Sequence, residues 1–284
     1  MYKIMTPGPT QVAENVRLAR SRECTNPDLD ASFVEFYKET CEEISRLLHT
    51  DNETLILGGE GILGLEAACA SMTEPGDRVL VLDNGIYGKG FADFVSMYGG
   101  IPELYSRDYR ETLDVQELEE FLKEHHNYKY ATVVHGDTPS GMLNDISAIC
   151  PLLKKYGIMT VVDSVSASFG EPMRISDWQI DIMCGGSQKV VSAPPGLTFV
   201  VISDDAKKAM AERKTPIASF YANLTTFAHY YEEKWFPYTM PISDIYGLVQ
   251  RSTISPQTRV SLHDMKNRRG FSQGNHRCRT EPLP

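Results

Sequence analysis

From residue 30 onward, segments with apolar residues at helical spacing alternate with short apolar and β-branched runs. Asp30 can cap the first helical pattern, whose apolar positions recur every three or four residues. These positions are Phe33, Phe36, Tyr37, Ile44 and Leu47. The pattern predicts strands at residues 55–57, 79–82, 102–105, 131–134, 159–162, 180–184 and 198–202. It predicts further helices at residues 65–70, 89–98, 114–125 and 146–156. Such alternation is typical of a layered α/β domain with a mostly parallel sheet.

The last stretch, residues 251–284, is polar, rich in Arg and His, and without sustained periodicity. It can bury little apolar area to offset the entropy of ordering. We therefore expect a tail that does not pack as part of the domain.

Charge and cysteine content exclude several classes. The formal net charge of −10 argues against a general nucleic-acid binder, because phosphate backbones are held by clustered Lys and Arg. The six cysteines form no CxxC pair, which fits neither a zinc site nor a disulfide framework. No apolar run approaches the ~20 residues of a membrane span, and no basic-then-apolar leader opens the chain. We expect a cytoplasmic protein with reduced thiols and no metal.

A lysine, Lys189, follows an apolar run and a Gly-Gly-Ser turn in the segment DIMCGGSQK (181–189). A lysine so placed can point into a cleft at the carboxyl end of the sheet, where its amine can form a Schiff base. The alternative is a solvated surface lysine, which is the commoner situation.

Asp163 ends a second apolar run, so it belongs at the same edge of the sheet, where open α/β sheets bind ligands. A carboxylate there can hold the pyridine nitrogen of pyridoxal phosphate (PLP) in its protonated form, which makes the ring an electron sink. The structural alternative is a helix cap or a turn aspartate.

The third element is the Gly-rich turn GGEGI (58–62), between a strand and a helix. Backbone N–H groups and the helix dipole can receive a phosphate there, although most Gly-rich turns only reverse the chain. Glu60 is unfavourable beside a phosphate unless its side chain turns away.

The motifs occur in a recognisable order: PGP (7–9), GEG (59–61), DNGIYG (83–88), HGDTPSG (135–141), VDS (162–164), SQK (187–189) and APPG (193–196). Together they resemble class V aminotransferases, especially the alanine–glyoxylate and serine–pyruvate group, from residue 6 to about 248. The resemblance implies a three-layer α/β large domain of the PLP-transferase type I (aspartate aminotransferase-like) class.

The same resemblance implies roles for individual residues. Lys189 carries PLP and later moves a proton between the substrate α-carbon and the cofactor, while Asp163 pairs with the pyridine nitrogen. Tyr87 stacks on the ring, where the alternative is a core aromatic. Thr138 lies near the 3-oxygen and phosphate side, and could equally be a turn residue. The other implied cofactor contacts are Gly61, Ile62, Val165 and Gln188, and Gly8 is the implied contact to the substrate carboxylate.

The family resemblance further implies a homodimer in which a partner subunit closes each phosphate site. The matching segment here is WFPYTMP (235–241), with Thr239 as the donated hydroxyl. The family's tyrosine aligns with Phe236, which lacks a hydroxyl, so Tyr238 is the candidate replacement. We divide the chain into an N-terminal active-site segment (1–20), a PLP-binding large domain (21–250) and the tail (251–284). The tail stands in place of a small C-terminal domain that would supply the arginine for the substrate carboxylate.

The expected function is transfer of an amino group from a small amino acid, alanine or serine, to a small 2-oxoacid, glyoxylate or pyruvate. Alternatives within the family act on aminoethylphosphonate, phosphoserine or ureidoglycine, or are desulfurases and lyases. Outside this set, the chain could be a PLP-binding protein with impaired catalysis, or an unrelated α/β domain with a chance lysine.

Overall fold

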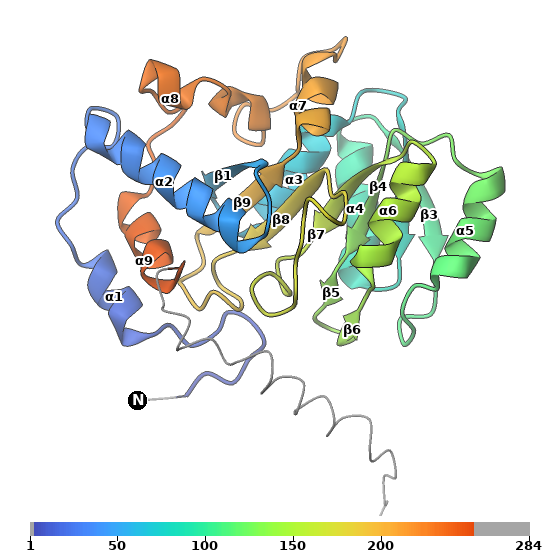
Figure 1. The fold of residues 1–284 in the computed structure, drawn as a ribbon, viewed down its shortest axis with the longest axis horizontal. Helices are drawn as coiled ribbons and strands as arrows, with labels where there is room; N and C mark the ends of the chain where they lie inside the picture. The colour runs from blue at the N-terminus through green and yellow to red at the C-terminus, as the bar shows by residue number, and fades with distance from the viewer. Residues whose placement is uncertain (1–2, 253–284) are drawn as a thin grey trace, which may run out of the picture.

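The computed structural model describes residues 3–252, which fold around one seven-stranded sheet (Figure 1). The order across the sheet is β1-β9-β8-β7-β4-β2-β3. The strands are β1 (Glu53–Gly58), β2 (Arg78–Asp83), β3 (Ile101–Ser106), β4 (Tyr130–Val134), β7 (Met159–Asp163), β8 (Ile182–Gly186) and β9 (Leu197–Ile202). A separate hairpin is formed by β5 (Gly136–Asp137) and β6 (Met142–Leu143).

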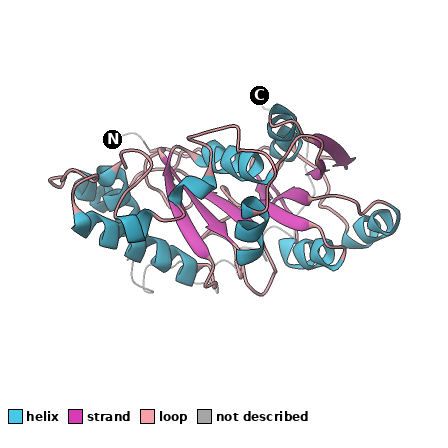
Figure 2. Ribbon diagram, turned by 90° about the horizontal axis from the view of Figure 1, so that it is seen from above, coloured by secondary structure: helices cyan, strands magenta, loops and turns pink. Residues whose placement is uncertain are grey.

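Helices cover both faces of the sheet, which gives three layers (Figure 2). They are α1 (Glu14–Arg20), α2 (Ala31–Leu47), α3 (Gly61–Met72), α4 (Ile86–Met97), α5 (Val115–Glu124), α6 (Ile146–Lys155), α7 (Asp204–Ala211), η1 (Leu224–Phe227), α8 (Tyr230–Glu233) and α9 (Ile242–Ser252). The apolar side chains between the layers form one continuous core, in which Tyr37, Phe91, Tyr130 and Phe199 are fully buried.

The expected fold class is confirmed. Strands β3, β2, β4, β7 and β8 run parallel to one another. Strand β9 is antiparallel to both β8 and β1, so β1 points the same way as β8. Each strand and helix expected from the sequence is present, and Asp30 caps α2 by accepting the N–H of Ser32. The carboxyl ends of β1, β2, β4, β7 and β8 therefore meet at one edge of the sheet.

Strand β8 begins and ends two residues later than the expected range 180–184. The two glycines that read as a turn are part of the strand, where Gly185 pairs with Phe199 and Gly186 with Thr198. A side chain at Gly185 would come within 2.1 Å of the Phe199 ring, so the glycine makes room for that ring. The turn starts only at Ser187.

Helices α1 and α9 were not expected from the sequence, and they pack against each other near the two ends of the described chain. Arg20 forms an ion pair with Asp244 at 2.5 Å, and a side chain at Gly247 would meet Arg20 at 2.9 Å. The contact ties the N-terminal segment to the end of the domain. The expected tail at 251–284 lies outside the described residues apart from the last two residues of α9.

Within residues 3–252, no helix is both long and apolar enough to cross a bilayer. No group of three or more His, Cys, Asp or Glu in this part of the chain is arranged to hold a metal ion. Cys41, Cys69, Cys150 and Cys184 are buried and carry free thiols.

Candidate active site

Lys189 lies in a loop that is closed by hydrogen bonds on both sides. The Ser187 hydroxyl donates to the carbonyl of Pro194 at 2.6 Å, and the Ser187 N–H donates to the carbonyl of Leu197 at 3.0 Å. From the N-terminal segment, the Thr10 hydroxyl donates to the Lys189 carbonyl at 2.7 Å, and the Thr10 N–H donates to the Gln188 carbonyl at 2.9 Å. The lysine backbone is thus held at the carboxyl edge from two directions.

Asp163 is the last residue of β7 and only 5% exposed. Its Oδ1 accepts the N–H of Val165 at 2.9 Å. Burial raises the pKa of Asp163 to about 6, and the hydrogen bond from Val165 and the positive charge of Lys189 act in the opposite direction. The charge of Lys189 is therefore felt at the Asp163 carboxyl, and a cationic N–H group bound beside this carboxyl would relieve the cost of burying it.

Gly8 packs directly on the Lys189 side chain. A Cβ atom at position 8 would lie 2.3 Å from Cδ and 2.8 Å from Nζ of the lysine. A side chain at position 8 would displace the amine from its present position, so the glycine of the PGP motif leaves this space to Lys189.

At the start of α3, several of the expected phosphate contacts come together. A Cβ at Gly61 would lie 2.7 Å from a methyl group of Val165, so these residues touch. The N–H of Ile62 and the Nε2 of Gln188 point to one place, but both already donate to the carboxylate of Glu60, at 3.1 and 2.8 Å. Glu60 does not turn away from the helix terminus as a bound phosphate would require.

Tyr87 lies in the first turn of α4 and is 40% exposed, so its ring is available to a ligand and is not a core aromatic. Its N–H donates to Oδ1 of Asp137 at 3.4 Å, and Asp137 also accepts from the Ser140 hydroxyl at 2.6 Å. A side chain at Gly85, the residue before α4, would come within 2.5 Å of the Asp137 carboxyl carbon. Asp137 thus caps α4 from another part of the chain.

Thr138 follows Asp137, and its hydroxyl shares a hydrogen bond of 2.5 Å with that of Ser166, three residues after Asp163. This hydrogen bond holds the residue after β5 next to the loop that follows β7.

Replacing Asp137 with alanine removes the acceptor of the Tyr87 N–H and the buried partner of Ser140. We expect the free energy of unfolding to fall by about 2 kcal/mol, as for the loss of a buried capping carboxylate. Denaturant titration checks this, with the exposed Asp93→Ala on the same helix as control. Equal stability of the two variants would contradict the capping role.

Thr239 does not join this group. It is exposed, and its hydroxyl donates to Asp28 at 2.9 Å. Phe236 is buried in an aromatic cluster, with its ring centroid 4.9 Å from that of Tyr37, which accounts for the missing hydroxyl. The Tyr238 ring stacks on Tyr221 at 4.1 Å.

His135 belongs to the HGDTPSG motif, but sequence reasoning assigned no role to it. Its backbone N–H donates to the Asp163 carbonyl at 2.8 Å, and its Nδ1 lies 3.1 Å from the Ser164 hydroxyl. Burial lowers the pKa of His135 to about 4, so the ring is neutral at physiological pH. These two contacts of His135 stabilise the end of β7 that carries Asp163.

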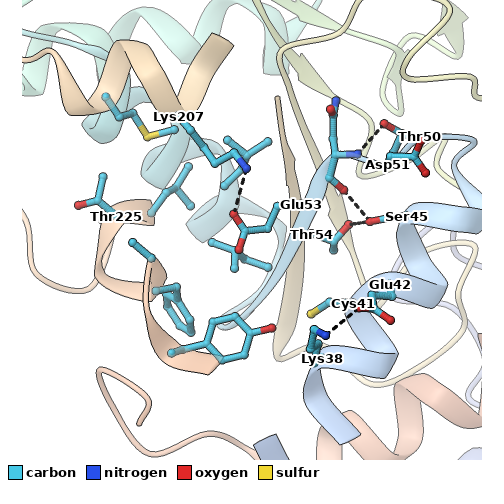
Figure 3. Close-up of a pocket in the computed structure, with 18 of the residues that line it drawn as sticks. Lys38, Cys41, Glu42, Ser45, Thr50, Asp51, Glu53, Thr54, Lys207 and Thr225 are labelled. Atoms are coloured by element: carbon cyan, nitrogen blue, oxygen red, sulfur yellow. Dashed lines mark hydrogen bonds and ion pairs between the residues drawn. The ribbon is translucent and has the colours of Figure 1, made fainter. Parts of the chain in front are cut away.

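A cavity of about 990 Å³ lies elsewhere (Figure 3). It is lined by α2, α7, η1 and the start of β1, where Glu53 faces Lys207 at 3.7 Å. Glu53 is at the opposite end of β1 from Gly58, and none of the expected site residues lines this cavity. It is not part of the candidate site.

Comparison with known proteins decides the family. The family described as "Aminotransferase class-V" matches residues 8–259. The chain belongs to the class V aminotransferase family. This membership removes the alternative of an unrelated α/β domain with a chance lysine.

Two curated members of the family are similar to the chain. Pyridoxamine–pyruvate transaminase of Mesorhizobium japonicum is 37% identical over 78% of the chain and 56% of its own length. Alanine–glyoxylate aminotransferase of Callithrix jacchus is 31% identical over 86% of the chain and 60% of its own length. The chain therefore spans less than two thirds of the length of these relatives.

Among solved structures, ureidoglycine–glyoxylate aminotransferase from Bacillus subtilis superposes with a TM-score of 0.89 and 25% identity. The match covers 96% of this chain and 70% of that one.

The cofactor of the class V family is PLP, and the residues present fit its ring. Asp163 is a buried carboxyl that lacks a cationic partner of its own at hydrogen-bonding distance among the described residues, and Lys189 supplies an amine at the same edge. At the phosphate end, the N-terminus of α3 and Gln188 supply donors, and Glu60 must release them before a phosphate can use them.

Proposed function

We propose that this chain binds PLP through Lys189 and transfers an amino group from alanine or serine to glyoxylate or pyruvate. The observation that carries the proposal is the position of the buried Asp163 at the end of β7 and of Lys189 in the loop after the neighbouring strand β8, at one edge of the sheet. The names of the similar proteins, which pair small amino donors with glyoxylate or pyruvate, support the substrate class.

In this proposal each residue has a distinct task. Bound PLP supplies an electron sink for the bond changes at the substrate α-carbon. Lys189 attaches the cofactor and then carries a proton to and from that carbon. Asp163 places a negative charge next to the pyridine nitrogen. Tyr87 stacks on one face of the ring. Gly8 leaves room for the substrate carboxylate beside the amine.

We further propose residues 1–20 as an active-site segment and 21–250 as the cofactor-binding domain of a homodimer. The exposed Thr239 is then available to the phosphate site of a second copy. Scattered free thiols support a reducing, cytoplasmic location.

A second candidate donor is pyridoxamine, with pyruvate as the acceptor. Glu60 favours it, because its carboxylate already holds two groups that would bind a phosphate, and pyridoxamine has none.

The test is a screen of the purified chain for amino transfer. Serine or pyridoxamine is supplied as donor with glyoxylate or pyruvate as acceptor, and alanine is supplied with glyoxylate alone, because alanine and pyruvate would only interconvert; each pair is tested with and without PLP. We expect glycine or alanine to form, quantified by mass spectrometry. Binding of PLP without transfer for any pair would favour a PLP-binding protein with impaired catalysis.

A further inference from the structure

We propose that the cavity at the amino end of β1 is a second ligand site, which takes an organic cation with N–H donors on an apolar body. The cavity measures about 990 Å³, within the range of small-molecule sites. It lies between α2 on one side and α7 and η1 on the other (Figure 3). Because Glu53 begins β1 and Gly58 ends it, this site is separate from the one that contains Lys189 and Asp163.

The first observation is the carboxylate of Glu53, which faces the cavity with its charge only weakly neutralised. It lies 3.7 Å from Nζ of Lys207, beyond hydrogen-bonding distance, while the same Nζ lies 2.8 Å from Asp204. Burial raises the pKa of Glu53, and Lys207 acts in the opposite direction. The negative charges of Glu232 and Asp204 add to the effect of burial. A cationic ligand that donates hydrogen bonds to this carboxylate would therefore relieve its desolvation.

The other cations of the cavity wall do not neutralise Glu53, because each is paired with a different carboxylate. Lys38 lies 3.3 Å from Glu42, and Arg46 lies 2.5 Å from Glu43. Figure 3 shows the pair of Lys38 and Glu42 on α2, apart from Glu53 at the start of β1. The surroundings of Glu53 thus favour a cation over an anion as the ligand.

The second observation is the hydroxyl of Tyr230, which also lines the cavity. The residue is only 8% exposed, and within residues 3–252 its hydroxyl forms no hydrogen bond. Burial raises the pKa of Tyr230, and Glu53 and Glu42 act in the same direction, so the hydroxyl lies near these carboxylates. A buried polar group without a partner is costly. The hydroxyl oxygen can accept a second N–H of a cation bound to Glu53.

The third observation is the apolar wall of the same cavity. Leu55, Leu224 and Phe227 line it, and each is at most 3% exposed. An inorganic cation would leave this wall in contact with water, whereas an apolar group attached to the cation would cover it. One weakly paired carboxylate, one hydroxyl acceptor and an apolar wall together fit an amidinium, guanidinium or ammonium group on a hydrocarbon body.

The experiment uses benzamidine, an amidinium on a phenyl ring, which carries no primary amine on a saturated carbon and so is not a donor for amino transfer. Its dissociation constant is measured by calorimetry on the full chain at pH 8, and we expect about 1 mM or lower. Benzamide, which has nearly the same shape but no charge, should bind at least about tenfold more weakly. Glu53→Gln should weaken the binding of benzamidine at least about tenfold, and Tyr230→Phe about threefold.

Glu39→Gln is the matched control. It removes the same charge from an exposed position on α2 that does not line the cavity, so it should bind benzamidine as the wild type does. Asp163→Asn tests the buried carboxyl of the candidate active site and should also leave the binding unchanged.

Three results would overturn the proposal: no binding of benzamidine by the wild type, equal binding of benzamide, or binding that Glu53→Gln does not weaken. Loss of binding in Asp163→Asn would place benzamidine in the candidate active site and overturn it as well. None of these results bears on whether Lys189 captures PLP, so the proposed function is tested separately.

Discussion

Replacing Lys189 with alanine abolishes the covalent capture of PLP and lowers the rate of amino transfer by at least about 10⁴-fold. The amine is the group that condenses with the cofactor aldehyde, with loss of water, and a positioned acid–base group alone contributes roughly 10²–10⁴-fold. The fold should survive, because the side chain is only partly buried and no described ion pair depends on it.

Borohydride reduction after PLP addition, followed by peptide mass spectrometry, measures the capture directly. We expect one labelled lysine in the wild type, Lys189, and none in the alanine variant. Lys189→Arg retains the positive charge beside Asp163 without a nucleophilic amine, so it separates charge from chemistry. Lys89→Ala, at an exposed lysine two residues from Tyr87, should behave as the wild type. A label on any other lysine would refute the assignment.

Replacing Asp163 with asparagine makes the ligand-free protein more stable at pH 8 and at the same time weakens ring binding. The carboxyl is buried, and burial raises its pKa from 3.8 to about 6. The folded chain thus holds this proton to a higher pH than the unfolded chain does. The contribution of this carboxyl to the free energy of unfolding therefore falls as the pH rises from about 4 to about 6, and it does not change further above pH 6.

Asparagine cannot ionise, so the variant escapes a cost of up to about 3 kcal/mol at pH 8. Urea titrations of both proteins should give a gap that closes towards pH 4. The contrasting control is Asp181→Asn. Asp181 is equally buried but paired with Lys154 at 2.9 Å. Its replacement leaves that cation with only the exposed Asp205, at 3.1 Å, and should destabilise the protein. A wild type more stable than Asp163→Asn at pH 8 would contradict the assignment of burial as the dominant influence on this carboxyl.

The same substitution should weaken ligand binding, although it stabilises the ligand-free protein. A protonated pyridine nitrogen would gain its counter-charge from Asp163, so we expect pyridoxamine to bind at least about tenfold more weakly to Asp163→Asn. A variant that is more stable and yet binds less well would mark Asp163 as a functional residue and not a structural one.

The layered fold and the edge at which the site lies follow from the amino-acid sequence alone. Helical and strand periodicities are local properties of the chain, and the carboxyl ends of parallel strands meet at one edge whatever the loops do. For that reason the pattern of residues was enough to bring together the ends of β1, β7 and β8, with Gly61, Asp163 and Lys189.

The pairing of side chains, in contrast, depends on the folded chain. The hydrogen bond from Gln188 to Glu60 joins residues 128 positions apart in the sequence. The bond by which Asp137 caps α4 joins residues 50 positions apart, and the bond from Thr239 to Asp28 joins residues 211 positions apart. The Gly-Gly pair at residues 185–186 predicted a turn, but Gly185 lies in strand β8. A glycine is needed there because the Phe199 ring of the next strand occupies the space of a side chain. Periodicity carries no information about contacts between distant segments, since these depend on how the packed elements place each side chain in space.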